Sequence, residues 1–171
     1  SEKNPRLTGK DKDRISKMIG IGAVKYADLS TDRTKDYVFD WDKMLSFEGN
    51  TAPYIMYAVV RINSVLKRGS FSTFSKVTLT EGDLIKREEE RTLILLLLNF
   101  SDVLHTIAND LMPNRLTDYL YELAEAFHRF YTRCPIIGSK EESSRLTLCF
   151  QVQAVLKKGL GILGIATLHK M

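Results

Sequence analysis

Large apolar residues recur every three or four positions between residues 114 and 132. At 100° per residue they fall on one side of a helix, so this segment is predicted to be strongly amphipathic. The apolar stripe consists of Leu116, Leu120, Leu123, Phe127 and Phe130. Such a helix is stable only when other elements cover its stripe. Strand patterns are almost absent elsewhere, and we therefore predict an all-α fold, a helical bundle of about five main helices.

Four further helices are expected from apolar spacing, capping residues and terminators. Gly20 and Gly22 weaken the first of them, which we expect to be imperfect or broken in its middle. The third carries a leucine-rich run and is expected to be one long buried helix. Ser143 or Ser144 is the expected N-cap of the last. The four ranges are 13–29, 51–66 ended by Gly69, 81–111 ended by Met112 and Pro113, and 144–163 ended by Gly164.

Two segments between the helices lack helical periodicity. Residues 30–50 alternate charged and aromatic side chains, which suits a packed connector or one short strand. We place a candidate domain boundary there. Residues 69–82 are rich in Ser, Thr and Gly, which predicts a mobile loop between two helices of the bundle.

Length and composition fit one domain with an appendage. The 171 residues are 44% hydrophobic, which is enough to form a buried core. Lys and Arg total 25 against 21 Asp and Glu, giving a formal charge of +4 and a pI near 9.0. This modest excess is compatible with a polyanionic partner, although many ordinary proteins share it.

Cysteine and histidine usage indicates a reduced compartment and no bound metal. Cys134 and Cys149 match no C-x-x-C spacing, and the chain has three His residues. We expect cytoplasmic residence, with an organellar form left open. The longest apolar run, residues 93–98, is far shorter than the roughly 20 residues that span a bilayer, so we expect no membrane contact. The polar first five residues do not resemble a secretory signal, and we expect them to continue a longer chain.

Motifs for catalysis are missing from the sequence. It contains no glycine-rich phosphate loop, no H-E-x-x-H pair and no G-x-S-x-G elbow. Asp40 and Asp42 flank Trp41, but acidic residues in such a segment are usually solvated or cap a helix. We assign no catalytic residue, and we disfavour an independent enzyme built on these acids and the histidines.

When the segment 51–68 is drawn as a helix, one stripe of its surface is apolar and another carries tyrosines and arginines; we call the second the polar stripe. Phenol rings stack on unpaired bases and guanidinium groups pair with phosphates, so the polar stripe indicates binding of single-stranded RNA. Packing of the tyrosines against a neighbouring helix is the alternative, and it applies to Tyr131 as well. His128 is expected to be an exposed helix residue without a ligand role. The polar stripe is Tyr54, Tyr57, Arg61 and Arg68, and the apolar stripe, roughly 140° away, is Ile55, Val59, Ile62 and Leu66.

Several stretches of the sequence resemble arginyl-tRNA synthetases. Residues 22–30, 37–42 and 47–54, with Tyr57, look like that family's passage into its anticodon-binding domain. Residues 120–124, then Phe127, Phe130, Tyr131 and the pair 134–135, are similar to its penultimate helix and turn. Arg145, residues 163–165 and Met171 resemble its final helix and terminus. The family typically ends Pro-x-Arg-Met, whereas Lys170 here keeps the charge without the planar guanidinium.

The resemblance implies a class I anticodon-binding domain in residues 46–171, preceded in residues 1–45 by the end of the catalytic and stem-contacting region. It also implies a partner, the anticodon loop of an arginine-accepting tRNA. The residues expected to bind this loop are Tyr54, Tyr57, Arg61, Arg68, Tyr131, Arg145, Lys170 and Met171.

Intact members of the family join arginine to tRNA with ATP and magnesium, using HIGH and KMSKS elements that this sequence lacks. We therefore expect this piece to be non-catalytic, to bind no cofactor itself, to be monomeric and to require a catalytic domain that precedes it. The competing hypothesis is an α-helical protein-interaction module whose Tyr and Arg stripe is a binding hot spot. Strong salt dependence would favour RNA.

Overall fold

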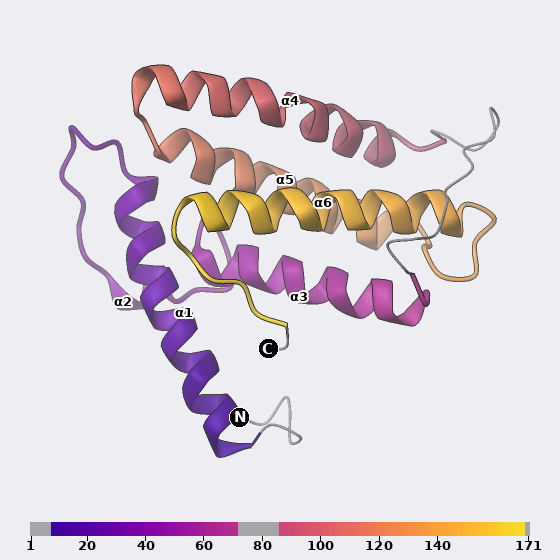
Figure 1. The fold of residues 1–171 in the computed structure, drawn as a ribbon, viewed down its shortest axis with the longest axis horizontal. Coiled ribbons are helices and arrows are strands. Elements are labelled where there is room, and N and C mark those ends of the chain that lie inside the picture. Colours follow the sequence, from indigo (N-terminus) through magenta and orange to yellow (C-terminus); the bar gives the residue numbers. More distant parts are fainter. Residues whose placement is uncertain (1–7, 72–85, 170–171) are drawn as a thin grey trace.

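The computed structural model describes residues 8–71 and 86–169, which form five long helices, one short helix and no strand. This architecture confirms the predicted all-α bundle. Helices α3, α4, α5 and α6 run roughly alongside one another, and α1 crosses them steeply at one end (Figure 1). The helices are α1 (Gly9–Ser30), α2 (Trp41–Met44), α3 (Ala52–Arg68), α4 (Glu88–Asp110), α5 (Asn114–Arg133) and α6 (Glu142–Ile162).

Helix α5 is the centre of the bundle, because it contacts α1, α3, α4 and α6. The five residues of its predicted apolar stripe are each no more than 1% exposed. Tyr119, on the side that meets α4, is also buried, and its hydroxyl donates to the carbonyl oxygen of Leu96 at 2.8 Å. The sequence pattern thus predicted both the helix and its buried side.

Helix α3 begins and ends as predicted, within two residues. The Thr51 side-chain oxygen accepts a hydrogen bond from the Tyr54 backbone N–H at 3.3 Å, and Pro53 lies in the first turn, where its missing N–H costs little. Ile55, Val59 and Ile62 are fully buried. The predicted apolar stripe therefore faces the core and leaves the opposite stripe toward solvent.

Helix α1 is continuous, so the expected break at Gly20 and Gly22 is wrong. Gly22 is buried where α1 meets α3 and the tail that follows α6. A Cβ atom at this position would stand 2.5 Å from Met56 Cε and 3.3 Å from Ile165 Cγ2. The close approach of these three segments offsets the loss in helix propensity of about 1 kcal/mol at Gly22, whereas a Cβ atom at Gly20 would meet nothing within 4 Å.

A hydrogen-bonded group fixes α1 to the connector, residues 31–51, and to α5. The Tyr26 hydroxyl donates to Asn50 Oδ1 at 2.7 Å and lies 2.9 Å from the carbonyl oxygen of Thr117. The Asn50 amide in turn donates to Asp118 Oδ1 at 2.9 Å. Burial of Tyr26 raises the pKa of its phenol, so the hydroxyl stays protonated and keeps donating.

The connector contains no strand, so that alternative is wrong, and it is packed only in part: Met44 is 6% exposed, but most of its other large apolar side chains face outward. It contains the single-turn helix α2, whose N-cap Asp40 accepts from the Lys43 backbone N–H at 3.1 Å. The apolar side chains around α2 are largely exposed, with Val38 at 88% and Trp41 at 53%. The alternating aromatic residues were misleading because most of them stay exposed and do not enter the core.

Helix α4 is not the buried helix that its composition suggested. Among its residues Glu90 and Leu93 are buried, whereas Leu95 is 55% and Leu98 is 71% exposed. The helix lies along one edge of the bundle and packs against α5 and α6, so an apolar run that covers every side of it must partly face outward (Figure 1). The expected start at residue 81 and most of the predicted 69–82 loop lie outside the described residues.

By length and composition alone, α4 would suffice to cross a membrane. A single helix of this kind is weak evidence, because core helices of soluble proteins and signal sequences pass the same test. Three consecutive glutamates, residues 88–90, stand in its first turn. The absence of a membrane span stays a prediction from the sequence.

Helix α6 begins two residues earlier than predicted and has no serine N-cap. Its N-cap is Glu141, and Ser144 lies inside the first turn, where its hydroxyl donates back to the Glu141 carbonyl oxygen at 3.0 Å. Its end agrees with the prediction, since Gly164 adopts φ +67°, which favours glycine. The tail that follows buries Ile165 and Leu168.

The packing of α6 on α5 yields a test with a matched control. A Cβ atom at Gly159 would stand 2.5 Å from Leu120 Cδ2, whereas one at Gly161 meets nothing within 4 Å. We expect Gly159→Ala to lower the free energy of unfolding by about 1–2 kcal/mol through overpacking. Gly161→Ala should raise it by up to about 1 kcal/mol through helix propensity.

Urea unfolding followed by circular dichroism measures both changes. Equal stabilisation by the two substitutions would show that α6 does not pack as closely on α5 as the structure indicates.

Candidate nucleic-acid interface

Helices α3 and α5 together present a surface of aromatic and basic side chains, of which Tyr57, Arg68 and His128 are exposed and Arg61 and Tyr131 are half-buried. The turns of α3 that place Ile55, Val59 and Ile62 in the core carry its tyrosines and arginines round to the solvent side. Helix α5 contributes the facing residues from its second half. We call this surface the tyrosine–arginine face, and it consists of Tyr57, Arg61, Arg68, His128 and Tyr131.

Arg61 is the central residue of the face. Its guanidinium carbon lies 4.6 Å from the centre of the Tyr57 ring and 5.1 Å from the centre of the Tyr131 ring. Nη2 donates to the Tyr57 hydroxyl at 2.6 Å, and Nη1 lies 3.1 Å from Nδ1 of His128. One cation is thus held between two rings and fixed by two hydrogen bonds, which limits the side-chain entropy that a ligand would have to remove.

Arg68 extends the face by two turns of α3. Its Nη2 donates to the Tyr131 hydroxyl at 3.4 Å, and its Nε donates to the carbonyl oxygen of Ser64, also at 3.4 Å. The side chain is exposed, and these contacts are long. A phosphate that approaches Tyr131 would therefore find one guanidinium group over the ring, from Arg61, and another at the hydroxyl, from Arg68.

Tyr54 belongs to the same helix but lies less openly than Tyr57. Its ring packs on Tyr121 of α5, with 5.5 Å between the ring centres, and partial burial raises the pKa of its phenol. Tyr57 is 40% exposed. Tyr54 therefore packs against a neighbouring helix, which was the alternative to RNA binding, whereas the ring of Tyr57 is accessible.

Sequence reasoning missed two residues of this region. Phe47 of the connector is 52% exposed and contacts the Tyr57 ring edge-on, with 6.4 Å between ring centres. His128 is exposed but fixes Arg61, contrary to the minor role expected for it. The sequence held one signal for each residue. Phe47 belongs to the stretch 47–54 that resembles the arginyl-tRNA synthetases. His128 lies one helical turn before Tyr131 on α5, and so on the same side of that helix.

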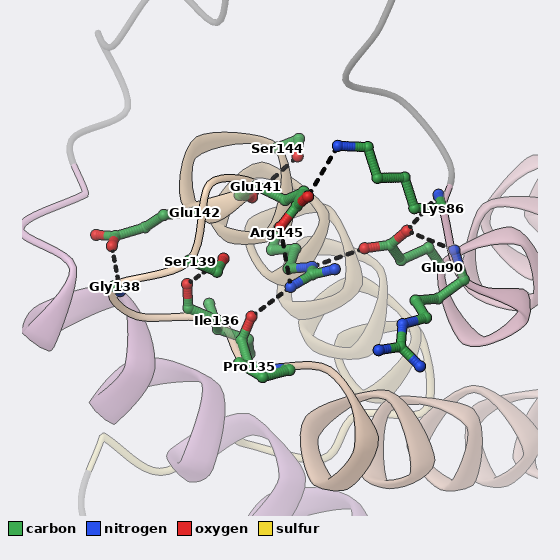
Figure 2. A network of polar contacts seen from close by, with 11 residues as sticks. Lys86, Glu90, Pro135, Ile136, Gly138, Ser139, Glu141, Glu142, Ser144 and Arg145 are labelled. Atoms are coloured by element: carbon green, nitrogen blue, oxygen red, sulfur yellow. Dashed lines mark hydrogen bonds and ion pairs between the residues drawn. The ribbon is translucent and has the colours of Figure 1, made fainter.

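Arg145, which was expected to contact RNA, is 5% exposed. Figure 2 shows its side chain directed toward Glu90 and Pro135. Its Nε donates to Glu90 Oε1 at 2.7 Å, and its Nη1 donates to the Pro135 carbonyl oxygen at 2.6 Å and lies 3.5 Å from Glu141. Glu90 also accepts from the backbone N–H groups of residues 86 and 87. Arg145 thus joins the start of α4 to the loop before α6, and we leave it out of the tyrosine–arginine face.

Lys170 and Met171, the other two residues expected to bind RNA, lie outside the described residues. The tail before them packs at the junction of α1 and α3, where Ile165 meets Gly22 and Met56. The structure therefore brings Tyr57, Arg61, Arg68 and Tyr131 together, places Tyr54 beside them, and separates Arg145 from them.

The buried ion pair between Arg145 and Glu90 leads to a stability prediction. Arg145→Met should lower the free energy of unfolding by about 3–5 kcal/mol, because it leaves the Glu90 carboxylate buried without its partner. Arg133→Met is the control, since Arg133 is 67% exposed and solvent screens its pair with Glu89, so its loss should change stability little. Equal urea midpoints for the two variants would contradict the structural role of Arg145.

Comparison with known families agrees with this geometry. A family model described as the DALR anticodon binding domain matches residues 55–171. The chain therefore belongs to the DALR anticodon-binding domain family. A second model, tRNA synthetases class I (R), catalytic domain, matches residues 1–41.

Similar proteins come from the arginine–tRNA ligases. The enzyme of Haemophilus influenzae (strain PittGG) is 48% identical over 174 residues, which cover 100% of this chain and 30% of that protein. The enzyme of Cellvibrio japonicus (strain Ueda107) is 45% identical over 175 residues, with the same coverage. The chain thus spans about 30% of the length of these curated relatives.

Solved structures share the fold. The arginyl-tRNA synthetase of Plasmodium falciparum superimposes with a TM-score of 0.83 at 33% identity, over 94% of this chain and 28% of that one. The arginyl-tRNA synthetase of Thermus thermophilus gives a TM-score of 0.85 at 28% identity, over 99% of this chain and 29% of that one.

Proposed function

We propose that this chain is the anticodon-binding part of an arginyl-tRNA synthetase and that its tyrosine–arginine face binds the anticodon loop of an arginine-accepting tRNA. The observation that carries the proposal is Arg61, held half-buried between the rings of Tyr57 and Tyr131 at the surface. The match to the DALR family and the arginine–tRNA ligases among the relatives support it.

The face combines the two contacts that single-stranded RNA requires. The exposed Tyr57 ring offers a surface on which an unpaired base can stack, and Phe47 enlarges that surface at its edge. Arg61 and Arg68 supply guanidinium groups that pair with phosphate oxygens. Tyr54 lies one turn before Tyr57 on α3 and is held against α5 by Tyr121. We keep Lys170 and Met171 as further proposed contacts.

In the intact enzyme, residues 1–45 would complete the catalytic region, and the match of residues 1–41 to a class I catalytic domain supports this division. That enzyme would join arginine to its tRNA with ATP. Within the described part of this chain, no three His, Cys, Asp or Glu side chains are grouped to hold a metal ion. We assign ATP and magnesium to the part of the enzyme outside this chain, because the sequence carries neither the HIGH nor the KMSKS element of the family.

Substitution of the tyrosines tests the proposal. Tyr57→Ala should weaken binding of an arginine tRNA transcript roughly five- to more than 100-fold, because a base stacked on an aromatic ring contributes about 1–3 kcal/mol. Tyr54→Ala should have a smaller effect because part of its ring already packs on Tyr121. Fluorescence anisotropy at fixed salt measures both affinities.

Tyr57→Phe is the matched control, since it keeps the ring and removes only the hydroxyl that accepts from Arg61. It should retain most of the affinity. Unchanged binding in folded Tyr57→Ala and Tyr54→Ala variants would exclude these residues as stacking platforms.

A further inference from the structure

The contact between Arg61 and His128 determines where the histidine ring carries its proton. Every polar atom of a guanidinium group is a donor, so Nδ1 of His128, 3.1 Å from Arg61 Nη1, must act as the acceptor. A neutral imidazole has one N–H, and in this arrangement it belongs to Nε2. Helix α3 thus fixes the tautomer of a side chain on α5.

Nε2 is then a hydrogen-bond donor on the surface. His128 is exposed, and the described residues provide no hydrogen-bond partner for Nε2. The two nitrogens lie on different edges of the imidazole ring, so the contact with Arg61 directs Nε2 away from the guanidinium. Through Nδ1 the ring is held against the guanidinium that contacts both Tyr57 and Tyr131, so Nε2–H lies at the border of the tyrosine–arginine face.

A neutral donor at this position suits the edge of a base better than a phosphate. Phosphate oxygens form their strongest contacts with charged groups, and Arg61 and Arg68 are both available nearby. A base that stacks on Tyr57 or Tyr131 extends its edge sideways, and base edges differ in whether they present acceptors or donors. A single N–H donor favours bases that present an acceptor and disfavours those that present a donor.

We propose that His128 is a specificity-determining residue of the tyrosine–arginine face, in which Nδ1 positions Arg61 over the two rings and Nε2–H donates to an acceptor on an anticodon-loop base. This inference rests on the proposed function. It assigns base discrimination to a residue whose sequence position indicated only an exposed helix surface.

Two conservative substitutions separate the two nitrogens. In His128→Asn the amide oxygen takes a position near Nδ1 and still accepts from Arg61, but nothing replaces the Nε2 donor. In His128→Gln the longer amide reaches the position of Nε2 and can still donate. His105→Gln is the control, since His105 is an exposed histidine on α4.

The experiment measures binding of the 171-residue chain and its variants to an arginine tRNA transcript and to a copy with all three anticodon bases replaced. His128→Asn should keep its affinity for the altered RNA and lose about fivefold of the preference for the native anticodon, as expected for one neutral hydrogen bond. His128→Gln should recover part of that preference, and His105→Gln should behave as the unsubstituted chain.

Undiminished preference in His128→Asn would overturn the inference and leave the proposed function intact. An equal loss of affinity for both RNAs would also overturn it, because it would mark His128 as a phosphate contact. Absence of any preference in the unsubstituted chain would overturn both the inference and base recognition by this face.

Discussion

Burial of the apolar stripe of α5 is the constraint on which the rest of the structure depends. Four other helices cover this helix, and one of them, α3, lies so that its own apolar stripe faces the same core. With both stripes buried, the remaining sides of α3 and α5 meet at the surface. Tyr57 and Arg61 are thereby placed against His128 and Tyr131, and the proposed RNA-binding face is a consequence of core packing.

Regular periodicity is the reason that α3 and α5 could be predicted from the sequence. Their apolar residues repeat at helical spacing, and their caps and terminators are local signals, such as Thr51 and Gly69. Helix α4 was misjudged because a run of leucines does not reveal how many neighbours surround it. Gly22 was misjudged because the benefit of close packing against Met56 depends on a segment more than 30 residues away.

In the candidate site too, contacts within one helix could be predicted from the sequence and contacts between distant segments could not. Tyr57, Arg61 and Arg68 share one helix, so their spacing alone placed them together. His128 and Phe47 join them only through packing of α5 and the connector on α3, which no local pattern encodes. Arg145 could not be distinguished from a surface arginine, because its partner Glu90 is 55 positions earlier in the chain and the pair forms only when α4 meets α6.

The most direct test of anticodon binding by this face is equilibrium binding of the chain to arginine tRNA and to a copy with altered anticodon bases, over a series of salt concentrations. The account predicts tighter binding of the native anticodon at every salt concentration. It also predicts that both affinities fall along a log–log line with a slope of about 0.7 for each single-strand phosphate contact. Salt-insensitive binding, or equal binding of the two RNAs, would contradict it.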